Sequence, residues 1–139
     1  MNEHVKFVFS DDFLTYHFHE NHPFNQKRVL LTKQLLEAAG LLDEGDIIPP
    51  RKATDEELSL FHDLDYIEAV KRAGKGKLSK EEGIVYGLGS EDTPMFPDMH
   101  EASSYLVGGT LTAVDAVLTG EASHALNLGG GLHHGFERQ

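Results

Sequence analysis

The sequence predicts an α/β fold in which a parallel sheet is flanked by helices. β-Branched and aromatic residues alternate at residues 5–9, and a second apolar run occupies residues 122–128; both patterns are typical of strands. Between them, apolar residues recur at helical spacing, most clearly at residues 98–119. Strands that alternate with helices favour parallel pairing. With 139 residues, the chain has the length of one domain or of part of a larger one.

The composition narrows the classes of protein to which the chain can belong. Hydrophobic residues make up 40% of the sequence, which is enough for a folded core. The formal charge of −11 at pH 7 argues against nucleic-acid partners, because phosphate binding needs a basic face. The same charge disfavours binding to anionic membranes. There is no cysteine, so disulfides and thiolate metal sites are excluded.

The N-terminal residues lack the basic and then apolar pattern of a signal peptide. No apolar run approaches the roughly 20 residues that a membrane helix needs. We therefore expect a soluble, cytoplasmic protein.

The first helix is predicted at residues 24–39. Leu31, Leu35 and Ala39 recur at a spacing of four residues, which predicts an apolar face turned toward the core. Gly40 follows and is a natural stop for the helix.

A short strand at Ile47–Ile48, ended by two prolines, precedes two shorter predicted helices. Thr54 and Glu57 form the Thr-x-x-Glu pattern of a capping box, which predicts a helix up to about residue 61. Asp63 or Asp65 can cap the next helix, which runs through residue 70 toward a glycine-containing breaker.

The longest helix is predicted at residues 98–119, with Asp98 as its N-cap. Gly108 and Gly109 inside it cost roughly 1 kcal/mol each relative to alanine. We expect close packing against another element to offset that cost. Small and apolar residues form the stripe that would make this contact: Ala102, Leu106, Gly109, Thr110, Ala113 and Val117.

Two adjacent histidines, His133 and His134, follow the last predicted strand in a glycine-rich loop. Ligands in open α/β sheets bind beyond the carboxyl ends of strands, and imidazoles titrate near neutral pH. This position therefore favours acid/base chemistry. The alternative is an ordinary loop in which one ring is hydrogen-bonded in the core and the other is solvated. The glycines at 129–131 are not a phosphate-binding loop, because no Lys-Ser/Thr pair follows them.

A second group of histidines, His17, His19 and His22, has a spacing that could hold zinc. The alternative is a solvated loop, which we favour because no fourth ligand follows at a defined spacing. An Asp-x-His pair, Asp98 and His100, is also of a type that chelates metals. Here Asp98 is better explained as the cap of the long helix.

Asp92 lies in a turn-forming segment at residues 89–94. Such carboxylates are commonly ordinary surface groups. The functional alternative is a carboxylate at the rim of a binding site, where it would accept hydrogen bonds from the backbone N–H groups of a substrate.

Five segments, in the same order and spread over nearly the whole chain, resemble motifs of the zinc-dependent histone deacetylase superfamily. The resemblance is closest to its bacterial acetoin-utilisation branch. The five are His22-Pro23 with Arg28, residues 52–58, residues 61–67, residues 86–94, and residues 130–134.

The resemblance implies the arginase/deacetylase fold, a central parallel sheet flanked by helices. It implies hydrolysis of acetyl-lysine or a related small acetyl-amide at a divalent metal, usually zinc, which polarises the carbonyl and activates water. By the same analogy His134 is the general base and His133 lies deeper and gives electrostatic help. Asp92 grips the substrate backbone, and Arg28 lines an internal cavity.

The chain departs from the family in one respect. The family's metal ligands and its oxyanion-stabilising tyrosine lie downstream of the paired histidines, and this sequence contains no counterpart of them. We therefore expect residues 1–139 to be the N-terminal portion of a single deacetylase domain. We expect it to hold no metal, to be inactive alone, and to self-associate through uncovered apolar surface. Two alternatives stay open: a histidine-rich metal-binding module, and a non-catalytic protein that recognises acetyl-lysine.

Overall fold

The computed structural model describes residues 4–130 and 135–139, and it contains the predicted parallel sheet. The strands are β1 (Val5–Val8), β2 (Ile47–Ile48) and β3 (His124–Leu126), in the order β2-β1-β3. Both pairings are parallel, with Phe7 opposite Ile47 and also opposite Leu126. The first strand in the sequence is therefore central, with the other two beside it.

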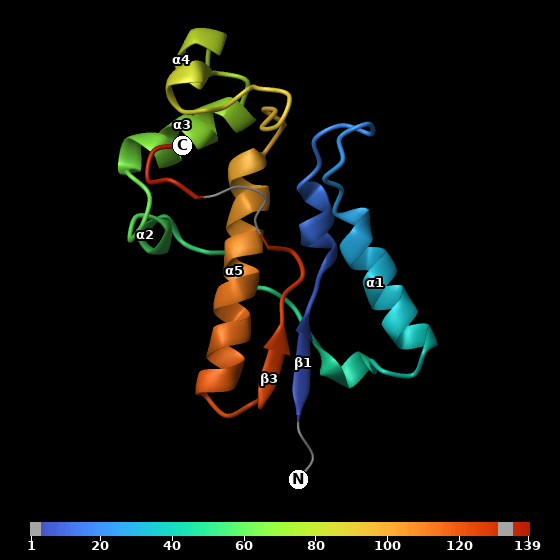
Figure 1. Ribbon diagram of the computed structural model, residues 1–139. Helices are drawn as coiled ribbons and strands as arrows, with labels where there is room; N and C mark the ends of the chain where they lie inside the picture. The colour runs from blue at the N-terminus through green and yellow to red at the C-terminus, as the bar shows by residue number, and fades with distance from the viewer. Residues whose placement is uncertain (1–3, 131–134) are drawn as a thin grey trace.

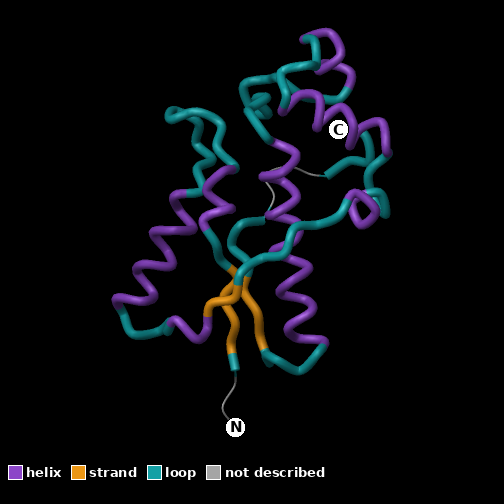
Figure 2. Tube along the Cα trace, turned by 180° about the vertical axis from the view of Figure 1, so that it is seen from behind, coloured by secondary structure: helices purple, strands orange, loops and turns teal. Residues whose placement is uncertain are grey.

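Two helices cover the sheet, α1 (Lys27–Ala38) and α5 (Met99–Leu118). They lie on opposite sides of the strands in both Figure 1 and Figure 2. The main core lies between these layers. Its buried members come from β1, α1, α5 and the connecting segments: Phe7, Val8, Phe9, Phe13, Val29, Leu42, Leu106 and Ala113. This architecture confirms the predicted parallel sheet flanked by helices.

Smaller helices complete the described part of the chain. They are η1 (Asp11–Thr15), η2 (Glu44–Asp46), α2 (Asp55–Leu58), α3 (Leu64–Gly74) and α4 (Lys80–Val85). In Figure 1, α3 and α4 lie beyond the arrowheads of the strands, beside the start of α5. A second apolar cluster holds them there, and its buried members are Val70, Ala73, Leu88, Phe96, Met99 and Ala102. The helices therefore build a cap over the carboxyl edge of the sheet.

The capping box at Thr54 and Glu57 is present as predicted. The sequence contains a second one that the prediction missed. Ser79 accepts a hydrogen bond from the Glu82 N–H (3.1 Å), and Glu82 accepts one from the Ser79 N–H (3.0 Å). This reciprocal pair starts α4, so the Ser-x-x-Glu spacing would have located that helix.

The predicted apolar face of α1 is wrong. Leu31 and Leu35 are 63% and 69% exposed. The face turned to the core carries Val29, which is 1% exposed, and the partly buried Leu36. Lys33 lies on the same side, with its ammonium group 5.5 Å from the centre of the Phe9 ring. The long lysine stem can cover apolar surface, so the covered face includes a charged residue that the spacing of the leucines did not predict.

The prediction that Asp98 caps α5 with its side chain is also wrong. Asp98 stands at the N-cap position but has a left-handed backbone (φ 55°) and makes no capping hydrogen bond. Its N–H instead donates to the Gly74 carbonyl (3.1 Å), at the end of α3. Tertiary docking of one helix end on another therefore fixes where α5 begins.

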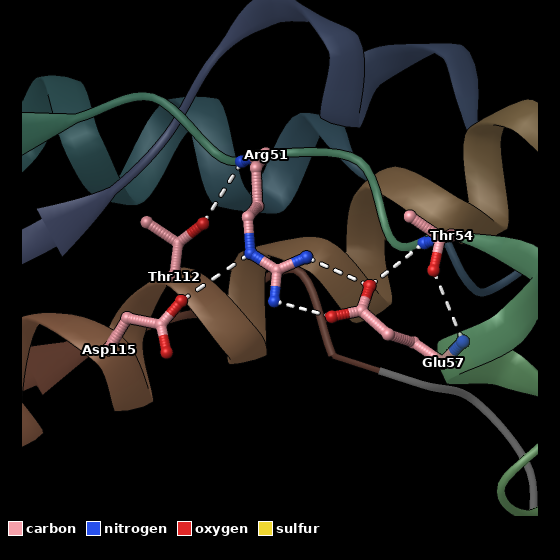
Figure 3. Close-up of polar contacts among 5 residues, drawn as sticks. All are labelled: Arg51, Thr54, Glu57, Thr112 and Asp115. Atoms are coloured by element: carbon pink, nitrogen blue, oxygen red, sulfur yellow. Dashed lines mark hydrogen bonds and ion pairs between the residues drawn. The ribbon is translucent and has the colours of Figure 1, made fainter.

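An extended segment between β2 and α2 crosses α5 and is fastened to it by Arg51 (Figure 3). The Arg51 N–H donates to the Thr112 hydroxyl (3.0 Å), and its guanidinium binds both Glu57 oxygens (2.9 and 2.7 Å) and Asp115 (3.4 Å). Hydrogen bonds from Arg51 are the main reason that the pKa of Glu57 falls to about 2, with the Thr54 N–H adding to them. The network joins the start of α2 to the middle of α5.

The glycine pair inside α5 makes the close contacts that the sequence predicted. A Cβ on Gly108 would overlap the Arg51 carbonyl oxygen and lie 2.9 Å from the Ala53 nitrogen. A Cβ on Gly109 would lie 2.7 Å from Cζ of Phe13. A neighbouring backbone at Gly108 and the Phe13 ring at Gly109 therefore approach α5 where its side chains are missing.

The first prediction concerns this contact. Gly108→Ala should lower the free energy of unfolding by about 1–3 kcal/mol or more, because the added methyl group meets backbone atoms that cannot rotate away. Urea denaturation of the purified chain measures the change. Gly45→Ala is the matched control, since no atom lies within 4 Å of its added Cβ. Equal stability of the two variants would contradict the prediction.

Candidate active site

His133 and His134, the predicted acid/base pair, lie outside the described residues, and so do Gly131 and Leu132. The described chain reaches Gly130 on one side and resumes at Gly135 on the other. We therefore describe the residues that come directly before and directly after this loop in the chain.

A cavity of about 360 Å³ lies among the segment that follows η1, helix α3, the first turns of α5 and the C-terminal residues. Gly135 and Phe136, which follow the histidine pair, form part of its wall. Thr93 and Pro94, which follow Asp92, form another part. The cavity therefore borders both segments that the sequence singled out, although they are some forty residues apart in the chain.

Aromatic rings line much of this cavity, namely those of Tyr16, Phe18, Tyr66 and Phe136. Tyr16 and Phe18 contact edge to face, with ring centres 5.2 Å apart. Burial raises the pKa of Tyr16 to about 12, and burial also raises the pKa of Tyr66. Both phenols therefore stay neutral at physiological pH. Apolar walls with a few polar atoms are typical of small-molecule sites.

His100 supplies one of the titratable groups in the wall. Its Nε2 lies 3.1 Å from Oδ1 of Asp55 in α2. Burial lowers the pKa of His100, and the Asp55 carboxylate opposes that effect in part. The Asp-x-His pair suggested by Asp98 and His100 is thus not used as a chelate among the described residues, since the imidazole pairs with Asp55.

His22 fixes the loop that carries Asp92. The ring is 8% exposed, and its Nδ1 accepts a hydrogen bond from the Phe24 N–H (3.0 Å). The proton must then be on Nε2, which donates to the Asp92 carbonyl (3.3 Å). The Asp92 side chain itself is exposed and has no partner among the described residues. The hydrogen bond from His22 therefore holds the backbone of the loop, while the Asp92 carboxylate lies at the surface.

Two of the three histidines of the possible zinc module are in contact, with the ring centres of His19 and His22 5.4 Å apart. His17 and His19 are exposed, whereas His22 is buried with both ring nitrogens in hydrogen bonds. Across the described parts of the chain, no group of three or more His, Asp or Glu residues is arranged to hold a metal ion.

Arg28 is exposed, and its guanidinium carbon lies 4.9 Å from the centre of the Phe24 ring. It is not among the residues that line the cavity, so its place in an internal cavity stays a prediction. Gln26, two residues earlier, is 2% exposed and donates to the Gly129 carbonyl (3.3 Å). Sequence analysis missed Gln26, because a glutamine before a helix gives no signal of burial.

The residues after the histidine loop are attached to the start of α3. The Glu137 carbonyl accepts a hydrogen bond from the Asp63 N–H (3.0 Å) and lies 3.3 Å from Nδ1 of His62. Arg138 pairs with Asp63 (3.1 Å) and with Asp65. Asp63 therefore stands at the N-cap of α3 without a capping side-chain bond, because its carboxylate turns to the arginine.

The comparison with known families decides what kind of protein this site belongs to. The histone deacetylase domain matches residues 22–139. The chain belongs to the histone deacetylase domain family. Within that family it is similar to the acetoin utilization protein AcuC of Bacillus subtilis (strain 168), with 64% identity over 130 residues, covering 94% of this chain and 34% of the relative. AcuC of Staphylococcus aureus (strain MRSA252) is 47% identical over 137 residues, covering 96% and 35%.

Solved structures of the family share the fold. An HDAC homolog from Aquifex aeolicus superposes with a TM-score of 0.85 at 34% identity, covering 97% of this chain and 36% of that one. An HDAC homolog complexed with SAHA gives a TM-score of 0.84 at 35% identity, covering 96% and 36%. The chain thus spans about a third of the length of the relatives that it matches. In the described ranges, the helices are all too short or too polar to cross a membrane.

The second prediction tests the His22 contact in this deacetylase-family chain. His22→Phe keeps a ring beside Phe18 but leaves the Phe24 N–H and the Asp92 carbonyl without a partner. Leaving such groups unpaired costs about 1–3 kcal/mol, so the free energy of unfolding in urea should fall by that amount. His17→Phe, at an exposed position, should change it by less than about 0.5 kcal/mol. Indistinguishable variants would contradict the assignment.

Proposed function

We propose that residues 1–139 are the N-terminal portion of a metal-dependent deacetylase domain that hydrolyses acetyl-lysine or a related small acetyl-amide. One observation carries the proposal. The wall of a single cavity includes the residues that follow His134 and the residues that follow Asp92. A base and a substrate-binding carboxylate could thus act on one ligand held between them. Membership of the deacetylase family and a neighbour structure complexed with SAHA support this assignment.

The cavity fits the proposed substrate class in its chemistry. Its walls include Tyr16, Phe18, Tyr66 and Phe136, which suit the uncharged methylene chain and acetyl group of an acetylated lysine. Acetylation removes the lysine charge, so the substrate brings no unpaired cation into this apolar space. The exposed Asp92 carboxylate is suited to accept hydrogen bonds from the N–H groups of a peptide backbone at the entrance.

The proposed roles in the reaction come from the family resemblance. Water adds to the acetyl carbonyl carbon, and the C–N bond of the amide then breaks. His134 takes the proton from the attacking water and returns it to the departing amine, as a general base and then a general acid. His133 stabilises the charge that develops nearby, and Asp92 holds the substrate. Arg28 keeps its proposed place near an internal cavity.

The described residues do not fit a divalent metal, because no three suitable side chains converge. The chemistry assigned to this chain is therefore proton transfer and substrate positioning alone. We propose that zinc or another divalent metal serves the intact family enzyme, that this chain by itself binds none, and that it is inactive alone. We also propose a cytoplasmic location, with no nucleic-acid or membrane partner, in keeping with its charge of −11.

The third prediction uses a chimera. Residues 1–139 replace the matching third of AcuC from Bacillus subtilis, the unaltered relative is assayed beside it, and turnover of an acetyl-lysine peptide is measured. His134→Ala should lower kcat/KM by about 10²–10⁴-fold, the usual contribution of general base catalysis. Asp92→Ala should act chiefly by raising KM. His17→Ala is the control and should change neither parameter.

Two outcomes of that experiment would refute the assignment. One is near-full activity of the His134→Ala chimera when the unaltered chimera is active. The other is zinc-dependent turnover by the 139-residue chain alone, which would show that the catalytic machinery of the chain extends beyond proton transfer and substrate positioning.

The fourth prediction concerns self-association. Leu31, Leu35, Leu60 and Leu118 are 63%, 69%, 87% and 79% exposed, and uncovered apolar surface favours association. We expect light scattering to show a mass that rises with protein concentration. A Leu31→Glu/Leu35→Glu variant should shift the distribution toward monomer, whereas Glu37→Gln on the same helix should not. A chain that stays monomeric at every concentration would contradict the prediction.

A further inference from the structure

Gln26 stands at the N-cap of α1, yet its side chain does not cap the helix. The side chain is buried, with 2% of the residue exposed. Its Nε2 donates to the Gly129 carbonyl across 103 positions of sequence (3.3 Å). Gly129 is buried too, and it stands where the chain leaves β3 for the histidine loop. A long polar side chain is thus used inside the molecule to hold one backbone group.

The N–H of the same glycine is held by a second amide. It donates to Oδ1 of Asn127 (3.0 Å), while Nδ2 of Asn127 donates to the Thr110 hydroxyl (3.0 Å) and lies 3.3 Å from the Leu106 carbonyl, both in α5. Both hydrogen-bonding groups of Gly129 are therefore fixed by side-chain amides. One amide comes from the segment before α1, and the other is anchored to α5.

Close packing adds to these two hydrogen bonds. A Cβ built on Gly129 would lie 3.1 Å from Cδ2 of Leu106 and 3.2 Å from Cδ2 of Phe13. The backbone at this point has little room to shift. Gly129 is therefore a fixed point in the backbone.

The other half of the Gln26 amide gives a second, independent observation. Its Oε1 is buried and makes no hydrogen bond with any residue in the described ranges. Rotating the amide by 180° would place this oxygen against the Gly129 carbonyl, so the donor orientation is required. A residue selected for stability alone would not keep an unpaired buried acceptor, because an apolar side chain of similar length avoids its desolvation cost.

We propose that Gln26 is a positioning residue for the catalytic histidines. Together with Asn127 it clamps Gly129 and so sets the direction in which the loop carrying His133 and His134 leaves the sheet. This rests on the proposed role of those histidines, but its test reads the loop itself and needs no turnover.

The test uses the whole 139-residue chain, labelled with ¹⁵N-glycine and ¹³C-histidine. Gln26→Met keeps the length of the side chain and removes its donor and acceptor. We expect the Gly129 amide to exchange about tenfold faster, because losing the hydrogen bond at its carbonyl makes it easier to open the backbone locally and so to break the N–H bond to Asn127. We also expect the ring resonances of His133 and His134 to shift. The melting temperature should change little, because one unpaired acceptor (the Gly129 carbonyl) replaces another (Oε1). Gln34→Met, at an exposed position of α1, should alter none of the three.

A second variant covers the case in which Gln26→Met fails to fold. In Gln26→Glu a protonated carboxyl group can donate to Gly129, whereas the ionised form repels that carbonyl. The ratio of Gly129 exchange in the variant to that in the unaltered chain should be near one at low pH and should rise as the carboxyl group ionises. Unchanged histidine resonances in Gln26→Met, or a ratio that is independent of pH in Gln26→Glu, would overturn the proposal. A lower melting temperature with unchanged resonances would show a purely structural role and would overturn it as well.

Discussion

The rest of the described structure depends on the face of α5 that carries Gly108 and Gly109, where neighbouring segments pack closely against the helix. At Gly108 the helix touches the backbone of the segment that links β2 to α2, and at Gly109 it touches Phe13. The same helix contributes Leu106 to the core over the sheet and Met99 to the core under α3 and α4. A helix is a stiff rod, so its 20 residues fix the distance between the sheet and the cap that surrounds the cavity.

Loops at the candidate site are held by polar side chains that reach in from one short segment before α1. His22 in that segment binds the backbone at Asp92, and Gln26 binds the backbone at Gly129. The two loops belong to different parts of the sequence, and each has a backbone carbonyl that accepts one of these hydrogen bonds. A buried backbone group needs a hydrogen-bond partner, and these side chains provide it. The backbone at Asp92 and the backbone at Gly129 are therefore both held by residues of one short segment.

Family membership explains why the sequence motifs and the three-dimensional arrangement agree. The chain superposes on an HDAC homolog over nearly its whole length while spanning only about a third of it. The described residues supply three parallel strands and a cavity, but no cluster that would hold a metal ion. In the function proposed above, the contribution of this part is to place acid/base and substrate-binding groups.

The sequence by itself determined the parallel α/β class, the strands at residues 5–8 and 124–126, the capping box at Thr54, and the close approach to α5 at its glycine pair. These features depend on local patterns: β-branched alternation, side-chain capping, and glycines inside an otherwise regular helix. The family motifs also pointed to Asp92 and to the histidine pair, whose roles stay proposals. Local chemistry is readable from sequence because the residues that decide it are neighbours in the chain.

Only the tertiary structure decided which face of α1 is buried, where α5 begins, and that Gln26 is buried against Gly129. Lys33 lies on the covered face, Gly74 fixes the start of α5 through a backbone contact, and Gln26 bonds to a residue 103 positions away. Each of these depends on a partner brought near by the folding of the whole chain. No periodicity or propensity encodes such a partner, since its identity is set by packing between elements that are distant in the sequence.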